Sequence, residues 1–377
     1  MIEVVHVITS LETGGAQRML EKLLEKMDRA RFRSRVVSLI AGGAVAERLA
    51  GQGIEVCALG MRRGVPDPRA ILRLRKRLAE WRPHVLQTWL YHADLVGALS
   101  ASAARPALAW NVRCSAQAKE TAGFRKSTAV RLCARLSHRP DVIVTNSSAG
   151  RVSHERIGYR ARRWVRIPNG FDLARYRPDP ERRRALRGAL GIPADAVLAG
   201  MLARFHPLKG HALFLQAGAR LARELSAPLQ LVCAGEGATL ENPAFAALVR
   251  AAGAEGVTLA LGERHDVPEL LAALDFLVLP SDTESFPNVL GEALACGLPC
   301  LATTVGDSAE IVGEAGILCA PGDLAALSAG LARLGRMPRA ERTRLGRLGR
   351  ARVEAHYELG VVARAYEALY TELAGSR

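Results

Sequence analysis

Two glutamates near the start of an expected helix, Glu284 and Glu292, are well placed for chemistry. An apolar strand expected at Phe276–Leu279 precedes a polar loop, and Pro287 suits the first turn of the helix that follows. The start of a helix presents unpaired amides and a positive dipole end, which favour a phosphate. The two carboxylates could therefore bind hydroxyl groups on either side of a diphosphate. For either glutamate alone, a helix-dipole contact or a solvated surface position is the alternative.

A second candidate site follows the strand expected at Val197–Leu202. Arg204 and Lys209 are separated there by a short loop. At the carboxyl end of a strand, an arginine fork and a lysine point charge can converge on a diphosphate. Because the chain has 52 lysines and arginines, a chance pairing is the alternative.

A third candidate is the pair Gly14 and Gly15, between a first strand expected to end at Ser10 and a helix. Without a Cβ atom, the glycine backbone can approach an oxyanion closely, and the helix dipole favours that charge. A plain tight turn is the alternative.

The elements that must position these residues alternate between short apolar strands and amphipathic helices. This alternation predicts an α/β fold with two doubly wound parallel sheets, in which ligands bind outside the carboxyl ends of the strands. The expected strands are Val4–Ile8, Val36–Ile40, Ile54–Leu59, Val85–Thr88, Ala107–Val112, Val142–Thr145 and Val165–Pro168, then Val197–Leu202, Leu229–Ala234, Val257–Leu261, Phe276–Leu279, Pro299–Thr303 and Ile317–Cys319.

The segment Ile167–Asp172 separates the two series of strands, so we expect two domains, 1–172 and 173–355, facing across a cleft. Within it, Asn169-Gly170 also fits a type I′ or type II turn. The pattern after Gly322 is almost wholly helical and predicts a final helix over Arg352–Ala374, so that residues 356–377 form a separate C-terminal helix.

Composition narrows the class of protein. The net charge of +15 predicts an anionic partner, which could be nucleic acid, a membrane surface or a phosphorylated substrate. The seven cysteines are scattered without metal-binding spacing, which indicates reduced thiols in a cytoplasmic protein. We expect no signal peptide and no membrane span, since the longest apolar stretch, Leu270–Pro280, is short and contains Asp275.

The stretch from Glu284 to Pro299 resembles the signature of retaining GT-B glycosyltransferases of family 4 in both acids, the Phe-Pro, the helix and the Gly-x-Pro stop. The linker with Asn169-Gly170, the Gly14-Gly15 loop and the Arg204–Lys209 loop resemble family elements too, although Ala203 stands where glycine is common. The resemblance implies a GT-B fold, with domain 1–172 binding the acceptor, domain 173–355 binding the nucleotide sugar, and the last helix returning to the first domain.

The resemblance also implies a role for each site residue. Arg204 and Lys209 would hold the nucleotide diphosphate, Glu292 the ribose and Glu284 the transferred sugar. Backbone amides of the first helical turn would meet the phosphates, and Gly14 and Gly15 would lie near the donor phosphate and the acceptor. The amides belong to Asn288, Val289 and Leu290.

Four further segments receive roles from the same resemblance. His92, after the strand at Val85–Thr88, would face the donor sugar; its alternative is capping a helix that starts around Ala93. Arg113 would meet a charge on the acceptor, with a solvated arginine as the alternative. Gly235–Gly237 resembles a family turn, and residues 262–267 would lie beside the base.

The implied reaction moves a sugar from a nucleotide diphosphate, UDP- or GDP-linked, to a glycan or polyprenyl-linked acceptor with retention of configuration. Closure of the two domains about Asn169-Gly170 would exclude water. No metal or other cofactor is expected, because no Asp-x-Asp element stands in a metal-binding context. For either of the basic segments Arg69–Arg77 and Phe124–Arg135 alone, a solvated face is the better interpretation. Together with the lipid-linked acceptors that the resemblance implies, they favour peripheral contact with an anionic inner membrane during synthesis of a bacterial surface polysaccharide.

Two other functions fit parts of the sequence. A sugar-nucleotide epimerase or a phosphorylase could share the GT-B architecture, but phosphorylases are longer and the epimerases lack this set of loops and linker. A nucleic-acid-binding protein would suit the charge, yet the chain is only 5% aromatic and has no recognition motif. A glycosyltransferase without a nucleic-acid partner is therefore the favoured prediction.

Overall fold

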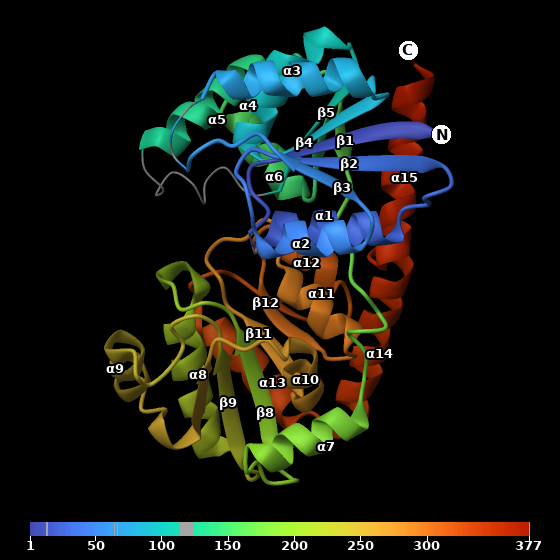
Figure 1. The fold of residues 1–377 in the computed structure, drawn as a ribbon. Coiled ribbons are helices and arrows are strands. Elements are labelled where there is room, and N and C mark those ends of the chain that lie inside the picture. The colour runs from blue at the N-terminus through green and yellow to red at the C-terminus, as the bar shows by residue number, and fades with distance from the viewer. Residues whose placement is uncertain (13, 64, 66, 114–123, 377) are drawn as a thin grey trace. The chain divides into compact units, whose positions relative to one another are not determined.

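The structure is a computed structural model that describes residues 1–12, 14–63, 65, 67–113 and 124–376. Cys114 lies outside these residues; the six other cysteines are free thiols. The chain forms two compact units, one of Met1–Gly170 with Leu359–Arg377 and the other of Phe171–Glu358. Each unit holds one parallel sheet with helices on both faces (Figure 1). The predicted fold class of two doubly wound parallel sheets is confirmed.

The first unit contains a seven-stranded sheet in the order β3-β2-β1-β4-β5-β6-β7. Its strands are β1 (Ile2–Ile8), β2 (Phe32–Ser38), β3 (Glu55–Ala58), β4 (Val85–Trp89), β5 (Ala107–Val112), β6 (Val142–Thr145) and β7 (Trp164–Arg166). Its α-helices are α1 (Gly15–Lys26), α2 (Ala44–Gly51), α3 (Arg69–Trp81), α4 (Tyr91–Ser100), α5 (Phe124–Leu136), α6 (Ser148–Arg156) and α15 (Leu359–Gly375).

Two apolar cores cover the faces of this sheet. Helices α1, α2 and α15 bury leucines and tyrosines against one face, and α3, α4 and α5 cover the other (Figure 1). The C-terminal helix contributes Tyr366 and Tyr370, both fully buried, to the first of these cores. The end of the chain is therefore an integral part of the unit that its beginning forms.

The second unit contains a six-stranded sheet in the order β10-β9-β8-β11-β12-β13. Its strands are β8 (Val197–Leu202), β9 (Leu229–Ala234), β10 (Thr258–Gly262), β11 (Phe276–Leu279), β12 (Cys300–Thr303) and β13 (Gly316–Cys319). Its helices are α7 (Pro180–Ala189), the 3-10 turns η3 (Pro207–Lys209) and η4 (Glu255–Val257), α8 (His211–Glu224), α9 (Pro243–Ala251), α10 (Val267–Ala273), α11 (Asn288–Ala295), α12 (Ser308–Val312), α13 (Leu324–Arg336) and α14 (Arg339–His356).

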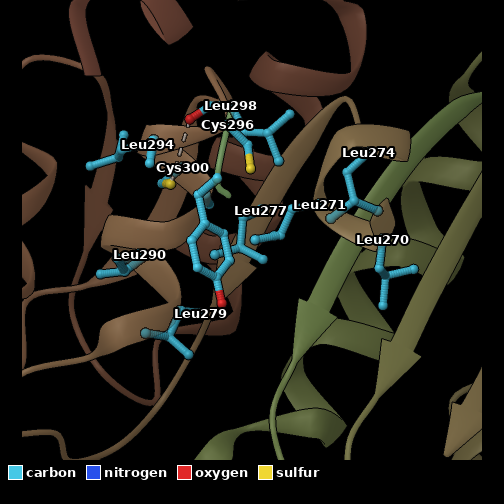
Figure 2. Packing of buried hydrophobic residues seen from close by; sticks show 14 of the residues in the cluster. Leu270, Leu271, Leu274, Leu277, Leu279, Leu290, Leu294, Cys296, Leu298 and Cys300 are labelled. Carbon is cyan, nitrogen blue, oxygen red and sulfur yellow. Dashed lines mark hydrogen bonds between the residues drawn. The ribbon is translucent and has the colours of Figure 1, made fainter. Parts of the chain in front are cut away.

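The core on one face of this sheet anchors helix α11. Figure 2 shows Leu290 and Leu294 of α11 grouped with Leu277 and Leu279 of β11. All four are almost fully buried. Burial of a leucine stabilises the fold by about 1.5–3 kcal/mol relative to leaving it exposed, so α11 is held firmly beside the strand that precedes it.

Strand β2 begins earlier than the sequence predicts. We expected Val36–Ile40, but the strand runs over Phe32–Ser38. Arg35 is buried in it because its guanidinium binds Glu3 of β1 and, at 2.7 Å, Glu55 of β3. Carboxylates on both neighbouring strands thus allow a charged residue within a sheet, which the apolar pattern does not reveal.

The single helix predicted over Arg352–Ala374 is wrong, because the chain breaks between α14 and α15. The break falls at Tyr357, whose carbonyl accepts a hydrogen bond of 2.8 Å from the amide of Phe171. Phe171 also forms an isolated parallel bridge with Glu358. The first and last residues of the second unit are thereby joined.

The turn at Asn169-Gly170 is also not of type I′ or II, since Gly170 does not have the positive φ that both turns require. A Cβ atom at Gly170 would lie 2.7 Å from Cδ1 of Leu359, so close packing explains this glycine.

Among the described helices, none has both the length and the apolar character needed to cross a bilayer.

Candidate functional site

The site in the second unit lies where the strand order reverses. Strand β8 pairs with β9 on one side and with β11 on the other. Because parallel strands end at the same edge, the loops that follow β8 and β11 leave the sheet side by side. The first loop carries Arg204 and Lys209, and the second carries Glu284.

Lys209 and Glu284 form an ion pair at this edge. The Nζ of Lys209 lies 2.6 Å from Oε1 of Glu284, and the two side chains are only 24% and 13% exposed. The hydroxyl of Ser281 donates a hydrogen bond of 2.9 Å to the same oxygen. The two loops are also joined by their backbones, since Asp282 N donates to Leu208 O at 2.9 Å.

Two glycines allow these loops to approach closely. Gly210 has a φ of +77°, and a Cβ atom there would lie 2.1 Å from the carbonyl oxygen of Pro280. Gly306, with a φ of +59°, would place a Cβ atom 2.7 Å from the carbonyl oxygen of Glu284. Larger residues at either position would push the Glu284 loop out of place.

The loop that carries Arg204 is held by the loop after β9, which is itself joined to the end of β10. Phe205 N donates to Glu236 O, and Gly235 N donates to Gly262 O, each at 2.7 Å. Gly235 supplies the close approach, because its Cβ atom would lie 2.3 Å from Ala203 O. Ala203 itself has no positive φ, so an alanine fits at this position. The side chain of Arg204 is exposed.

Helix α11 begins one residue later than we predicted. Pro287 is its extended N-cap, with a φ of −73° and a ψ of 99°, rather than part of its first turn. Asn288, Val289 and Leu290 form that first turn, as expected. The Leu290 amide already donates to Pro287 O at 3.2 Å, so that amide has an acceptor within the protein.

Glu292 is half-buried on α11 and contacts Tyr176. Burial, and then the charge and hydrogen bond of Glu292, raise the pKa of Tyr176, which keeps the phenol protonated as a donor to the carboxylate. Gly291 beside it is required by packing, since a Cβ atom there would lie 2.1 Å from the ring of Phe171.

The candidate residues of the first unit also follow two adjacent strands, β1 and β4. Gly14 is the N-cap of α1 and Gly15 is its first residue, as predicted. His92 is the exposed second residue of α4, whose N-cap is Leu90 with a φ of +73°. The alternative in which His92 caps a helix starting at Ala93 is therefore wrong.

Arg113 is bound within the first unit. Its guanidinium donates to Asn111 at 3.2 Å, to the Tyr366 hydroxyl at 3.0 Å and to Asn169, and it lies over the ring of Trp89. These contacts join Arg113 to β5, the linker and α15, so Arg113 has a structural role in this conformation. These partners could not be predicted from the sequence, because they come from distant segments.

Sequence reasoning missed Ser281 and Tyr176, which touch the two candidate glutamates. The signal for Ser281 is its place three residues before Glu284, directly after the strand and Pro280. Tyr176 gives no such signal. Within the described part of the chain, no group of three or more histidines, cysteines, aspartates or glutamates is arranged to hold a metal ion.

Comparison with known proteins identifies both units. The family model described as Glycosyltransferase Family 4 matches residues 13–175, and the model described as Glycosyl transferases group 1 matches residues 196–336. The glycosyltransferase EpsF of Bacillus subtilis is 28% identical over 313 residues, which cover 79% of this chain and 78% of EpsF. A D-inositol 3-phosphate glycosyltransferase of Saccharomonospora viridis is 38% identical over 148 residues, which span only 37% of this chain and 34% of that protein.

Solved structures agree on the fold. Anabaena HepE, crystallised in complex with UDP, superimposes with a TM-score of 0.84 at 22% identity, covering 98% of this chain and all of that one. The lipopolysaccharide outer core galactosyltransferase WaaB superimposes with a TM-score of 0.74 at 14% identity, covering 98% of this chain and 100% of that chain. These structures show a GT-B fold built from both units. Because two glycosyltransferase family models together span most of its length, the chain belongs to the family 4 (group 1) glycosyltransferases.

Proposed function

We propose that the protein transfers a sugar from a nucleoside diphosphate, UDP or GDP, to a glycan or lipid-linked acceptor. The observation that carries this proposal is the Lys209–Glu284 pair at the carboxyl ends of β8 and β11, in a chain of family 4. Three neighbouring HepE structures contain UDP, UDP with glucose, and UDP-glucose, and they support a nucleotide-sugar donor.

The reaction requires stabilisation of the negative charge that develops on the leaving group. The bond between the anomeric carbon and the diphosphate oxygen breaks, negative charge develops on the phosphate, and the acceptor oxygen bonds to the same carbon. Lys209, Arg204 and amides of the first turn of α11 supply the positive charge and donors in our proposal. We infer attack from the face that the phosphate leaves, so that the phosphate takes the acceptor proton and the configuration is retained.

The two glutamates bind hydroxyl groups in this scheme. Glu284 accepts hydrogen bonds from the transferred sugar, and Glu292 accepts them from the ribose. Because protein cations and amides serve the diphosphate, the proposed reaction needs no metal ion. Roles for His92, Gly14 and Gly15 toward the donor remain predictions from the resemblance.

We further infer a cytoplasmic enzyme of bacterial surface polysaccharide synthesis that touches an anionic membrane peripherally. Exposed arginines on α3 and α5 support such contact, as does a basic groove of about 830 Å³ in the first unit. The groove is lined by Arg131, Ala134, Arg135, His138, Ile157, Gly158 and Arg160.

Thermal unfolding with a panel of UDP, GDP, ADP and CMP tests the donor assignment. One nucleoside diphosphate is expected to stabilise the protein by about 2.7 kcal/mol at a hundredfold excess over its Kd, with or without EDTA. Glu292→Ala should remove most of this stabilisation, while Glu255→Ala, at an exposed position of the same unit, should retain it. Stabilisation by DNA or RNA but by no nucleotide would contradict the proposed function.

A further inference from the structure

Ser281 holds one oxygen of Glu284 from inside the second unit. Its side chain is fully buried, and its hydroxyl donates to Oε1 of Glu284 at 2.9 Å. The buried hydroxyl of Thr303, on β12, donates to the carbonyl of Ser281 at 2.6 Å and fixes the backbone of that serine. The Ser281 hydroxyl is therefore aimed by the neighbouring strand.

The same oxygen also accepts a hydrogen bond from Lys209, whose Nζ lies 2.6 Å away. No donor among the described residues forms a hydrogen bond with the other oxygen, Oε2. Both internal donors thus hold Oε1, and the carboxylate retains an oxygen with unused acceptor capacity.

The two donors differ in mobility and in what else they could bind. Lys209 has a flexible stem and is 24% exposed, so a diphosphate at this edge would compete for its charge. Ser281 is buried and short, and Thr303 holds its backbone, so its hydroxyl has little freedom to leave Oε1. A carboxylate held in this way enters the reaction already oriented, which reduces the entropy lost on binding.

We propose that Ser281 is a positioning residue that fixes Glu284 through Oε1 and so presents Oε2 to the sugar of the donor. This inference rests on the proposed function, because it gives Glu284 the sugar as its ligand. It adds a residue that touches neither the sugar nor the phosphate and acts only through Glu284.

A matched control exists on the next helix. Ser308, the first residue of α12, is also fully buried, and its hydroxyl has no hydrogen-bond partner among the residues that the structure describes. Ser308→Ala removes the same atom from another fully buried position, one whose hydroxyl does not bond Glu284. It reports what the loss of a buried serine hydroxyl does to this unit in general.

The experiment measures nucleoside diphosphate release from UDP-glucose, or from whichever UDP- or GDP-sugar of a panel the wild type cleaves. Ser281→Ala should lower kcat about tenfold, the effect of losing one hydrogen bond to a charged group. By calorimetry, the affinity of Ser281→Ala for the free nucleoside diphosphate should stay within about twofold of wild type. Its affinity for the nucleotide sugar, relative to that for the free nucleoside diphosphate, should fall. Ser308→Ala should match the wild type in kcat and in both affinities.

The decisive arm repeats Ser281→Ala in a Glu284→Ala background. If Ser281 acts through Glu284, adding Ser281→Ala to Glu284→Ala changes neither kcat nor the ratio of the affinities for the nucleotide sugar and the free nucleoside diphosphate. An undiminished effect of Ser281→Ala in that background, or equal effects of Ser281→Ala and Ser308→Ala, overturns the inference and leaves the proposed function standing. A wild type that binds and cleaves no nucleotide sugar overturns the proposed function itself.

Discussion

Lys209→Ala is expected to lower turnover by about 10²–10³, the range seen when one preorganised donor to a developing anion is lost. The substitution removes a positive charge from the diphosphate and also leaves Glu284 without the cation that now lies 2.6 Å away. An unpaired carboxylate beside a diphosphate repels it, so affinity for the nucleoside diphosphate should fall as well. Nucleotide release assays and calorimetry measure the two effects separately.

Lys26→Ala is the matched control for this prediction. Lys26 is an exposed lysine at the end of α1, so its loss changes the net charge equally. Turnover should remain that of the wild type. If Lys209→Ala retained wild-type turnover and nucleotide affinity, Lys209 would have no part in binding the donor.

Asp275→Ala is expected to destabilise the second unit by about 3–5 kcal/mol, because it leaves buried cations without a counter-charge. Asp275 binds Arg183 at 2.7 Å and Arg187 at 2.6 Å, and it accepts a hydrogen bond from the Leu198 amide at 2.8 Å. Arg187 is itself buried. A fall in the melting temperature on the order of 10 °C should follow for a unit of this size.

The exposed Asp195 provides the control, and Asp195→Ala should melt like the wild type. The pH dependence offers a second check. Burial alone would raise the pKa of Asp275, but Arg183, Arg187 and the Leu198 amide hold that pKa below its ordinary value of 3.8. The stabilisation is therefore complete above that value and is lost as the pH falls through the lower folded-state pKa. The difference in stability between wild type and Asp275→Ala should narrow as the pH falls. A difference in stability that does not depend on pH would contradict this assignment.

The sequence predicted all of the strands because most are continuous apolar runs buried on both faces. Strand β2 was misplaced where Arg33 and Arg35 interrupt that pattern, since an ion pair across strands is not visible in a single segment. The break at Tyr357 was missed for a similar reason. Its acceptor carbonyl is satisfied by Phe171, which lies far away in the sequence.

The candidate residues of the second unit could be placed at one sheet edge from the order of strands and loops. Their contacts could not be predicted, because spacing in sequence does not say which atoms of Lys209, Ser281 and Glu284 meet. Arg113 is the opposite case, in which a residue predicted to bind a ligand is bound by the protein itself. A basic residue after a strand suggests a ligand, yet here Asn111, Asn169 and Tyr366 occupy its donors.

The most direct measurement is NMR of wild-type protein incubated with UDP- and GDP-sugars, following phosphorus for the leaving group and protons for the anomeric carbon. We predict that one donor releases its nucleoside diphosphate, slowly to water and faster with an acceptor, with EDTA present. The first sugar product should keep the configuration of the donor. Release from no donor in the panel, or a first product of inverted configuration, would contradict it.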